Sequence, residues 1–218
     1  MDFHSGRGMG EGYPPRAFHF LPGLVPEPRS TGRRPPYPVH HDIDRVLICA
    51  EEIRAGITRV AAEVTAMYTG RAFTVVGVLK GSCVFVGDLI RAVPIPLELA
   101  FLSASSYRDG TTAGRLDLSF FPAEGEIAGK HILLVDDILD TGRTMQALAD
   151  ALLERGAADV KTCAFLDKPS RRAVDIEPDF RGFAVDDLFV VGYGLDFAGR
   201  YRNLPYVGAL RPDVVAKG

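Results

Sequence analysis

The sequence of 218 residues has no tryptophan, only three cysteines and only five histidines. Cys49, Cys83 and Cys163 lie far apart inside apolar stretches, and no CxxC pair occurs. This spacing argues against a disulfide framework and favours reduced thiols in the core of a cytoplasmic protein. Four of the five histidines fall within the first 41 residues, which leaves too few elsewhere for a histidine metal cage or a Ser/His/Asp triad in the rest of the chain.

Long apolar runs and a strong charge of one sign are also missing. No stretch approaches the ~18 consecutive apolar residues that a membrane span needs. The short apolar stretch at residues 18–25 is broken by Pro22, so we expect no secretory signal. The formal net charge of −3 argues against a broad nucleic-acid-binding surface. We therefore expect a cytoplasmic location, with no membrane and no nucleic acid among the partners.

Proline and glycine are unevenly spread along the chain. Residues 1–41 hold 8 of the 15 prolines and 6 of the 23 glycines. Such a segment has too little periodic apolar surface to offset the entropy lost on ordering it. The sequence therefore predicts a disordered tail over residues 1–41 and one domain over residues 42–218, in which 20 basic and 25 acidic residues leave a net charge of −5.

From Asp42 onward, short apolar runs alternate with stretches of helical periodicity. Runs of strand length bounded by turn residues predict buried strands, and apolar residues repeating every three or four positions predict helices. Short continuous strands separated by helices indicate an α/β fold with a mostly parallel central sheet flanked by helices. The predicted strands are 73–79, 97–102, 115–121, 132–135, 160–166 and 188–191; the helices are 51–67, 82–93 and a third through 145–152, and 103–114 is a polar loop.

The segment VDDILDTGRT, residues 135–144, begins at the end of the strand 132–135. Ligands of open parallel sheets bind beyond the carboxyl ends of the strands. Two carboxylates stand there, and a short turn then presents a third carboxylate, two hydroxyls and a glycine at a helix N-terminus, which is a cradle for a phosphate monoester. Paired carboxylates beside a phosphate fit a ribose, whose hydroxyls they can accept. The predicted ribose-phosphate site is Asp136, Asp137, Asp140, Thr141, Gly142, Arg143 and Thr144.

This segment resembles the phosphoribosyl pyrophosphate (PRPP) binding motif of type I phosphoribosyltransferases, and more closely that of the hypoxanthine-guanine phosphoribosyltransferase family. The likeness covers nearly all of residues 42–210 and includes further motifs in the same order. They are VLKG at 78–81, SSY at 105–107, FVVGY at 189–193, Asp196 and YRNL at 201–204. The resemblance implies the type I phosphoribosyltransferase fold, with a small hood region and a mobile lid loop beside the central sheet.

The resemblance implies a purine-salvage reaction. N9 of hypoxanthine or guanine displaces pyrophosphate from C1′ of PRPP, which gives IMP or GMP. The leaving group is highly charged, so the site needs cations and donors aimed at it. Mg²⁺ is implied as the cofactor, with Asp136, Asp137 and Asp196 as its carboxylate ligands. The implied pyrophosphate-binding residues are Lys80, Gly81, Ser106, Tyr107 and Arg202, with a cis peptide bond between Leu79 and Lys80.

The purine end is expected at Lys168, Phe189, Val190 and Asp196. Lys168 follows the strand 160–166, so it too lies at a carboxyl edge. Its ammonium can donate to O6 of hypoxanthine or guanine and cannot accept from the 6-amino group of adenine. Phe189 can stack on the purine, backbone groups at Val190 can read its edge, and Asp196 lies near the metal and the purine by resemblance. Asp140 is the expected catalytic residue, a carboxylate that accepts the purine N7 proton.

Two alternatives stay open. An enzyme of the same fold with another base preference, such as xanthine, is one, because nothing in the sequence ranks hypoxanthine, guanine and xanthine. A PRPP- or nucleotide-sensing regulatory protein that binds RNA is the other. The net charge of −5 over residues 42–218 disfavours that protein, and the presence of Asp140 favours turnover. The resemblance also implies a homodimer or a homotetramer.

Overall fold

A computed structural model describes residues 37–106 and 116–217 of the chain. Residues 1–36 of the predicted tail, and residues 107–115 of the predicted lid loop, lie outside the described residues. None of the described helices is long and apolar enough to cross a membrane.

A six-stranded sheet with the order β4-β3-β2-β5-β6-β7 forms the centre of the domain. All neighbouring strands pair in parallel except β3 and β4, which are antiparallel. The mostly parallel sheet predicted from the sequence is therefore confirmed. Its strands are β2 (Phe73–Leu79), β3 (Glu98–Ser106), β4 (Leu116–Phe120), β5 (His131–Leu139), β6 (Asp159–Asp167) and β7 (Phe180–Ala184).

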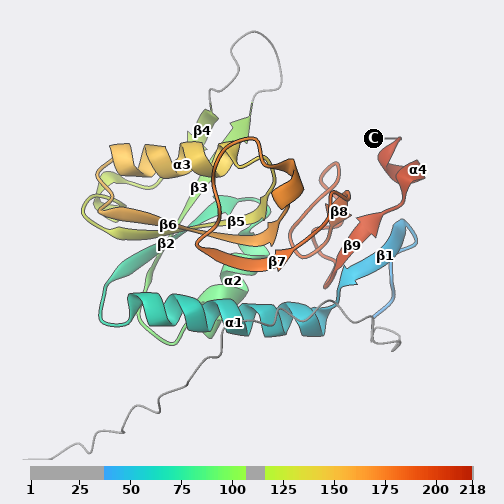
Figure 1. Cartoon of the computed structure of the whole chain (residues 1–218), viewed down its shortest axis with the longest axis horizontal. Coiled ribbons are helices and arrows are strands. Elements are labelled where there is room, and N and C mark those ends of the chain that lie inside the picture. The colour runs from blue at the N-terminus through green and yellow to red at the C-terminus, as the bar shows by residue number, and fades with distance from the viewer. Residues whose placement is uncertain (1–36, 107–115, 218) are drawn as a thin grey trace, which may run out of the picture. The chain divides into compact units, whose positions relative to one another are not determined.

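Helices cover both faces of this sheet (Figure 1). Helices α1 (Ala50–Tyr68) and α2 (Cys83–Ala92) pack on one face, and α3 (Arg143–Glu154) packs on the other. Because side chains alternate along a strand, β2 supplies Val75 to the cluster under α1 and α2 and Val76 to the cluster under α3. Two apolar cores therefore hold the carboxyl ends of the parallel strands in fixed positions.

A second sheet, here called the small sheet, has the order β1-β9-β8 and is antiparallel. It consists of β1 (Ile43–Ile48), β9 (Val207–Leu210) and β8 (Val190–Val191), and the short helix α4 (Pro212–Val215) follows it. The prediction of a parallel strand over 188–191 was wrong, because only Val190 and Val191 are extended and they pair with β9. Tyr37 stacks on Tyr206 beside this sheet, with ring centroids 5.1 Å apart.

Several local predictions need correction. The strand predicted at 132–135 continues to Leu139, because its pairing with β6 runs on to Leu139 and Asp167. Strand β3 likewise continues to Ser106, into the predicted polar loop, because it pairs with β4. Ser82 does not cap α2 with its side chain, since its hydroxyl donates to the carbonyl of Val78 at 2.6 Å. All three cysteines are free thiols, but Cys83 is exposed rather than in the core.

Candidate functional site

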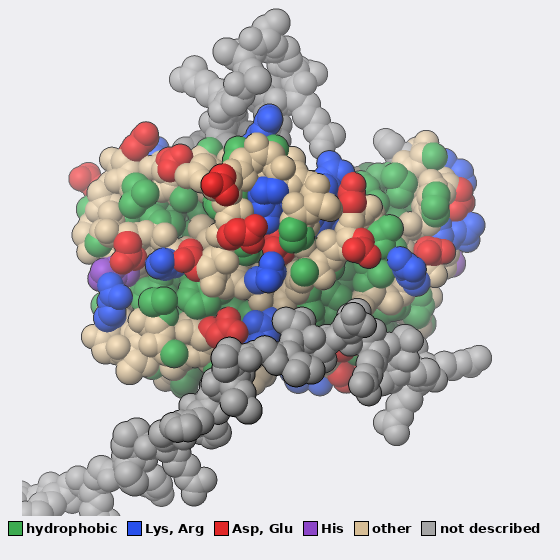
Figure 2. Space-filling view, in the orientation of Figure 1, with side chains coloured by type: hydrophobic (Ala, Val, Ile, Leu, Met, Phe, Trp, Pro, Cys, Tyr) green, Lys and Arg blue, Asp and Glu red, His purple; other side chains and the backbone are tan. Residues whose placement is uncertain are grey.

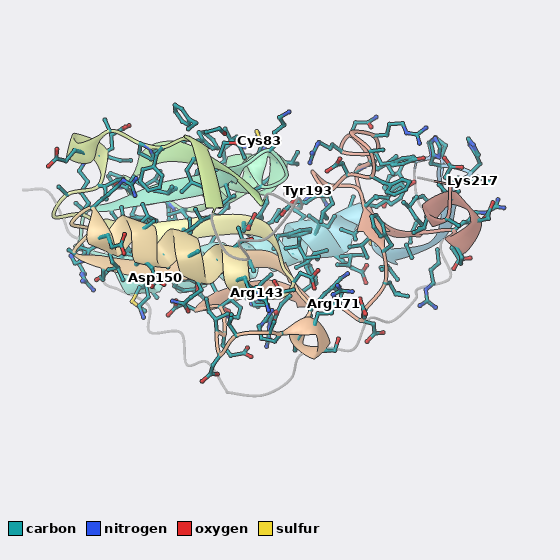
Figure 3. The ribbon with its side chains drawn as sticks, turned by 90° about the horizontal axis from the view of Figure 1, so that it is seen from above. Cys83, Arg143, Asp150, Arg171, Tyr193 and Lys217 are labelled. Carbon is teal, nitrogen blue, oxygen red and sulfur yellow. The ribbon has the colours of Figure 1, made fainter. Side chains whose placement is uncertain are left out.

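Three loops meet at the carboxyl edge of the central sheet, because β2, β5 and β6 are adjacent and parallel. Lys80 and Gly81 follow β2, the turn Asp140–Gly142 follows β5, and Lys168 follows β6. The predicted phosphate, pyrophosphate and purine residues of these loops therefore lie on neighbouring strands. Figure 3 shows the same edge, with Arg143 at the first turn of α3 and Arg171 on the short 3₁₀ helix η2 (Pro169–Arg171).

Asp136 and Asp137 lie inside β5 rather than beyond its end, which corrects the sequence-based placement. Asp136 is buried, and its Oδ1 accepts a hydrogen bond of 2.9 Å from the Asp137 amide. Burial, and the neighbouring charge of Asp137, hold the pKa of Asp136 well above its usual value. Burial also raises the pKa of Asp137, while Arg202 opposes that effect. A buried carboxylate and a half-buried one are therefore adjacent in β5, an arrangement that suits the hydroxyl groups of a ligand.

Gly81 is a position where only glycine fits. A Cβ atom at this residue would lie 1.6 Å from Asp137 Oδ2, so the loop after β2 can approach the carboxylate only without a side chain. The peptide bond between Leu79 and Lys80 is cis, as the resemblance implied. Lys80 itself is exposed at the edge. The loop thus presents a cation and a close backbone segment beside the buried carboxylates.

The turn Asp140–Gly142 leads directly into α3. Gly142 is buried with φ +83°, and no side chain makes a capping hydrogen bond at this N-terminus. The first N–H groups of a helix have no partner within the helix and carry the positive end of its dipole. Thr141 and Thr144 are half-buried beside them. The residues expected to bind a phosphate therefore lie at a helix N-terminus that no side chain caps.

Lys168 and Asp140 are linked through charged neighbours. Lys168 is 7% exposed, and its Nζ donates to the carbonyl of Leu188 at 2.7 Å. Burial lowers the pKa of Lys168, and the charges of Asp140 and Asp187 oppose that effect. Arg171 joins these two carboxylates, with Nε 2.6 Å from Asp140 Oδ1 and Nη1 3.1 Å from Asp187 Oδ1. The acid and the cation predicted to handle the purine thus share one ionic cluster.

The other purine-side residues are Val190, in β8 of the small sheet, and Phe189, which precedes it. Phe189 is 44% exposed and packs edge-on against Phe197, at 5.1 Å between ring centroids. Val190 is buried and pairs with Ala209 in the antiparallel β8–β9 ladder. Because Lys168 bonds to Leu188, the residue preceding Phe189, the end of β6 and the start of this segment are in contact. An exposed aromatic face beside a buried ammonium is suited to a flat, oxygen-bearing ring.

Arg202 and Asp196 lie on one turn that packs against Gly81. Arg202 Nη2 is 2.7 Å from Asp196 Oδ1, and Nη1 donates to the carbonyl of Gly194 at 2.6 Å. A Cβ atom at Gly194 would lie 2.1 Å from the Gly81 carbonyl oxygen, so the two backbones touch. The structure therefore brings Arg202 and Asp196 to the Lys80–Gly81 loop. Ser106 ends β3, and the lid residue Tyr107 lies beyond the described residues.

The metal prediction can be tested against the described carboxylates. Within residues 37–106 and 116–217, the group of at least three potential ligands whose donor atoms lie within 4.8 Å of one another is His40, His41 and Asp42. Asp136, Asp137 and Asp196 do not form such a group. Mg²⁺ usually takes one or two carboxylates together with substrate phosphates and water. The carboxylates at the sheet edge therefore suit Mg²⁺ that is bound together with a phosphorylated substrate. They do not suit a metal site made of protein ligands alone.

Two arginines at the site were missed by sequence reasoning. Arg171 bonds to Asp140 and Asp187, and Arg172 Nη1 donates to the carbonyls of Leu139 and Asp140. The sequence did contain a signal, because these two arginines are adjacent. They follow the carboxyl end of a buried strand and lie within four residues of Lys168. On the face seen in Figure 2, basic and acidic side chains are interspersed, in keeping with such local ion pairs.

Residues 49–198 match the sequence profile of the phosphoribosyl transferase domain family. This match covers more than half of the chain and defines the class of protein as a phosphoribosyltransferase. The hypoxanthine-guanine phosphoribosyltransferase of Bacillus subtilis (strain 168) is 43% identical over 174 residues, which are 80% of this chain and 97% of that protein. The chain therefore belongs to the hypoxanthine-guanine phosphoribosyltransferase family, and the predicted enzyme class is confirmed.

Other relatives agree with this assignment. The bifunctional protein TilS/HprT of Listeria monocytogenes serotype 4b is 43% identical over 179 residues, which are 82% of this chain and 28% of that longer protein. A crystal structure of a hypoxanthine phosphoribosyltransferase from Staphylococcus aureus has a TM-score of 0.75 at 38% identity and covers 80% of this chain and 95% of its own. A Trypanosoma cruzi hypoxanthine phosphoribosyl transferase has a TM-score of 0.78 at 34% identity, with 83% and 98% covered. The predicted fold is confirmed.

Proposed function

We propose that this chain transfers the 5-phosphoribosyl group of PRPP to N9 of hypoxanthine or guanine, giving IMP or GMP and pyrophosphate. The observation that carries this proposal is the junction of three loops at one sheet edge. One loop is suited to pyrophosphate, one to a ribose phosphate and one to an oxopurine. Each lies on a neighbouring parallel strand, so a single PRPP molecule and a purine base can reach all three.

Asp136, Asp137 and the turn 140–144 bind the ribose phosphate. The uncapped N-terminus of α3 receives the 5-phosphate, with Thr141, Arg143 and Thr144 as further donors. The ribose hydroxyls donate to the carboxylates of Asp136, which is buried, and of Asp137, which is half-buried. Such hydrogen bonds favour the charged form of a carboxylate and lower its pKa. Ligand binding should therefore release protons from the Asp136–Asp137 pair.

Lys80, the Gly81 backbone and Arg202 bind the pyrophosphate, with Ser106 and Tyr107 as further contacts. Departure of pyrophosphate leaves positive charge on the ribose ring, and fixed cations near the leaving group stabilise the transition state. Mg²⁺ would neutralise part of the pyrophosphate charge, and one or two of the carboxylates of Asp196, Asp136 and Asp137 would hold it together with oxygens of the substrate. Arg202 already lies 2.7 Å from Asp196, so the cation and the carboxylate are held together at this side of the site.

Asp140 is the catalytic residue. Attack by N9 makes the N7 proton acidic, and the Asp140 carboxylate accepts it. Arg171 Nε lies 2.6 Å from Asp140 Oδ1, so the carboxylate is held in place before the base arrives. Lys168 donates to O6 of the base, Phe189 stacks on its face, and Val190 and Asp196 line its edge.

Two further parts of the proposal concern the whole protein. We propose a homo-oligomer, either a dimer or a tetramer, and the Trypanosoma cruzi relative was solved in a study of its oligomeric state. We also propose a cytoplasmic location, which the free thiols of Cys49, Cys83 and Cys163 support.

Steady-state turnover with PRPP and each of five bases tests this proposal: hypoxanthine, guanine, xanthine, adenine and uracil. We expect activity with hypoxanthine and guanine that is lost when the divalent cation is chelated. Preference for xanthine would support an enzyme of the same fold with another base. Binding of PRPP or nucleotide without turnover of any base would instead indicate a regulatory protein.

A further inference from the structure

Arg172 is almost buried, with 11% of its side chain exposed, and the reaction above gives it no role. Its Nη1 donates to two consecutive backbone carbonyls, that of Leu139 at 3.0 Å and that of Asp140 at 2.6 Å. Its Nη2 bonds to the carboxylate of Asp167, which is fully buried at the end of β6. One guanidinium therefore connects the start of the phosphate turn to the strand that carries Lys168.

The same segment makes two more contacts with the turn. The amide of Lys168 donates to the Leu139 carbonyl at 3.0 Å, and the amide of Ala173 donates to the Thr141 carbonyl at 2.9 Å. The carbonyls of Leu139, Asp140 and Thr141 thus all accept bonds from residues 168–173. Three successive peptide units are held on one side by a single neighbouring segment.

This arrangement fixes the direction of the amides. In a trans peptide unit the C=O of one residue and the N–H of the next point in opposite directions. Because the carbonyls of residues 139–141 face the segment 168–173, the N–H groups of Asp140, Thr141 and Gly142 face away from it. Successive N–H groups on one side of a turn form a concave site for an anion. The opposite side of the turn is therefore set before a phosphate binds.

A buried ion pair adds little net stability to a fold, because both charges must be desolvated. Removing two charges from water costs several kcal/mol each, and well-packed apolar residues often replace such pairs without loss. Asp167 has a second cationic partner, Arg181, whose Nη1 lies 2.9 Å away. Arg181 could neutralise Asp167 alone, so the charge of this carboxylate does not by itself explain a second, buried arginine.

We propose that Arg172 is a positioning residue for phosphate binding, which holds the carbonyl side of the turn 139–141 so that its amide side is preset for the 5-phosphate of PRPP. This proposal rests on the function proposed above. It makes Arg172 act through the backbone of the turn and not by contact with the substrate. It also explains why the phosphate turn and the segment after Lys168 are joined.

Arg172→Gln and Arg181→Gln form a matched pair in the full-length protein. Each removes one cation from Asp167, but only Arg172→Gln releases the carbonyls of Leu139 and Asp140. We expect Arg172→Gln to raise the KM for PRPP by about tenfold or more, because a misplacement of about 1 Å can cost on the order of 100-fold. The KM for hypoxanthine should change less, because Lys168 keeps its bond to Leu188. Arg181→Gln should leave the KM for PRPP within about twofold.

Hydrogen exchange of the amides of residues 140–142 measures directly whether the turn binds PRPP. PRPP should protect these amides in the wild type and in Arg181→Gln, and protection should be lost in Arg172→Gln at the same PRPP concentration. Equal KM changes in the two variants, or intact protection in Arg172→Gln, would overturn the proposal. A wild type that binds PRPP but turns over no base would refute the proposed function, while the exchange result would still decide the role of Arg172.

Arg172→Lys covers the case in which Arg172→Gln does not fold. A lysine keeps a charge for Asp167 but has no planar fork to reach two carbonyls at once. A raised KM for PRPP with a melting temperature near that of the wild type supports positioning. An unchanged KM for PRPP in Arg172→Lys would overturn it.

Discussion

The two ends of the candidate site are built in different ways. The phosphate end consists of one continuous stretch, residues 136–144, on β5, its turn and the start of α3. The purine end combines Lys168, which follows β6 of the central sheet, with Phe189 and Val190, at the start of β8 in the small sheet. The two segments meet through the bond between Lys168 and the Leu188 carbonyl. A continuous stretch can be read from sequence, whereas a site assembled from two sheets depends on contacts that only the fold creates.

Each end of the site also buries a titratable group, the Asp136 carboxyl at the phosphate end and the Lys168 ammonium at the purine end. Burial raises the pKa of Asp136 and lowers that of Lys168, so each group is poorly solvated in the ligand-free protein. Under the proposed function, ribose hydroxyls would bond to the first group and a purine carbonyl oxygen to the second. Binding free energy at both ends therefore comes partly from relieving buried groups, and substitutions at the two ends should affect different substrates.

The largest effect is expected at Asp140. Asp140→Asn keeps the size of the side chain but removes the base that accepts the N7 proton, so kcat should fall by roughly 10²–10⁴-fold. Affinity for PRPP should be kept, because the turn amides are unchanged. Single-turnover measurement of the chemical step checks this, since product release limits many such enzymes.

Asp187→Asn is the matched control for Asp140→Asn. Asp187 is the other carboxylate that bonds to Arg171, but it lies on the purine-side loop and is exposed. We expect the chemical step of Asp187→Asn to stay within about threefold of the wild type, well below the loss typical of a missing base. An unchanged chemical rate in Asp140→Asn would remove Asp140 from the mechanism.

Lys168→Gln should act on the purine and not on PRPP. A neutral amide replaces a charge-assisted hydrogen bond, whose loss costs about 1.5–3 kcal/mol, so kcat/KM for hypoxanthine and guanine should fall by about 10–100-fold. Discrimination against adenine should narrow, because the glutamine carbonyl can accept from the 6-amino group. The measurement is kcat/KM for the three bases in both proteins, together with the KM for PRPP.

Lys161→Gln provides the control on the same strand. Lys161 pairs with Asp179 on the surface at 2.8 Å, away from the carboxyl edge. Its substitution should leave the ratio between oxopurines and adenine unchanged. If Lys168→Gln also keeps that ratio, Lys168 does not read the base, and specificity then belongs to the backbone around Val190.

A smaller effect is expected on the stability of the phosphate end. The folded pKa of Asp136 lies above its unfolded value, so its contribution to stability is present at low pH and is lost as pH rises through the folded pKa. Asp136→Asn removes the ionisable carboxyl, so stability is no longer lost as pH rises through this pKa. We expect a gain of about 1 kcal/mol at pH 7, or roughly 2–4 °C in Tm, together with weaker PRPP binding. Thermal unfolding of the ligand-free protein at pH 7 and near pH 4 checks this, because the gain should shrink at the lower pH; a lower Tm at pH 7 contradicts it.

The sequence predicted the central sheet better than the small sheet for a physical reason. The strand 73–79 was placed correctly because a run of seven mostly apolar residues, six of them buried, is bounded by Gly70 and by Lys80-Gly81. Strands β8 and β9 have two and four residues, too few to show a period, and they are held by pairing with each other and with β1. Strand β7, with only five residues, was missed as well.

The same limit applies within the site. The phosphate turn could be predicted from the sequence because its hydrogen-bond donors are close together in the chain. Arg171 and Arg172 were not, because their partners are the Asp140 side chain and two carbonyls about 30 residues earlier in the chain. Backbone carbonyls carry no sequence signal, so a residue that acts by bonding to them is recognised only in the structure.

The smallest effect is expected from removing the tail, and it tests whether the purine and phosphate ends need anything outside the two sheets. Tyr37 stacks on Tyr206, and its hydroxyl accepts a bond of 3.0 Å from the Ala50 amide at the start of α1. A chain that starts at Pro36 keeps these contacts, and one that starts at Val39 loses them. Both should keep kcat/KM within about twofold, since no residue before position 39 takes part in the proposed chemistry. The shorter chain should be less stable by about 1 kcal/mol, the value of one hydrogen bond, measured as a lower Tm.

A tenfold loss of kcat/KM in the chain starting at Pro36 would show that residues 1–35 act on the site or hold the oligomer together. Loss confined to the chain starting at Val39 would assign that effect to Tyr37.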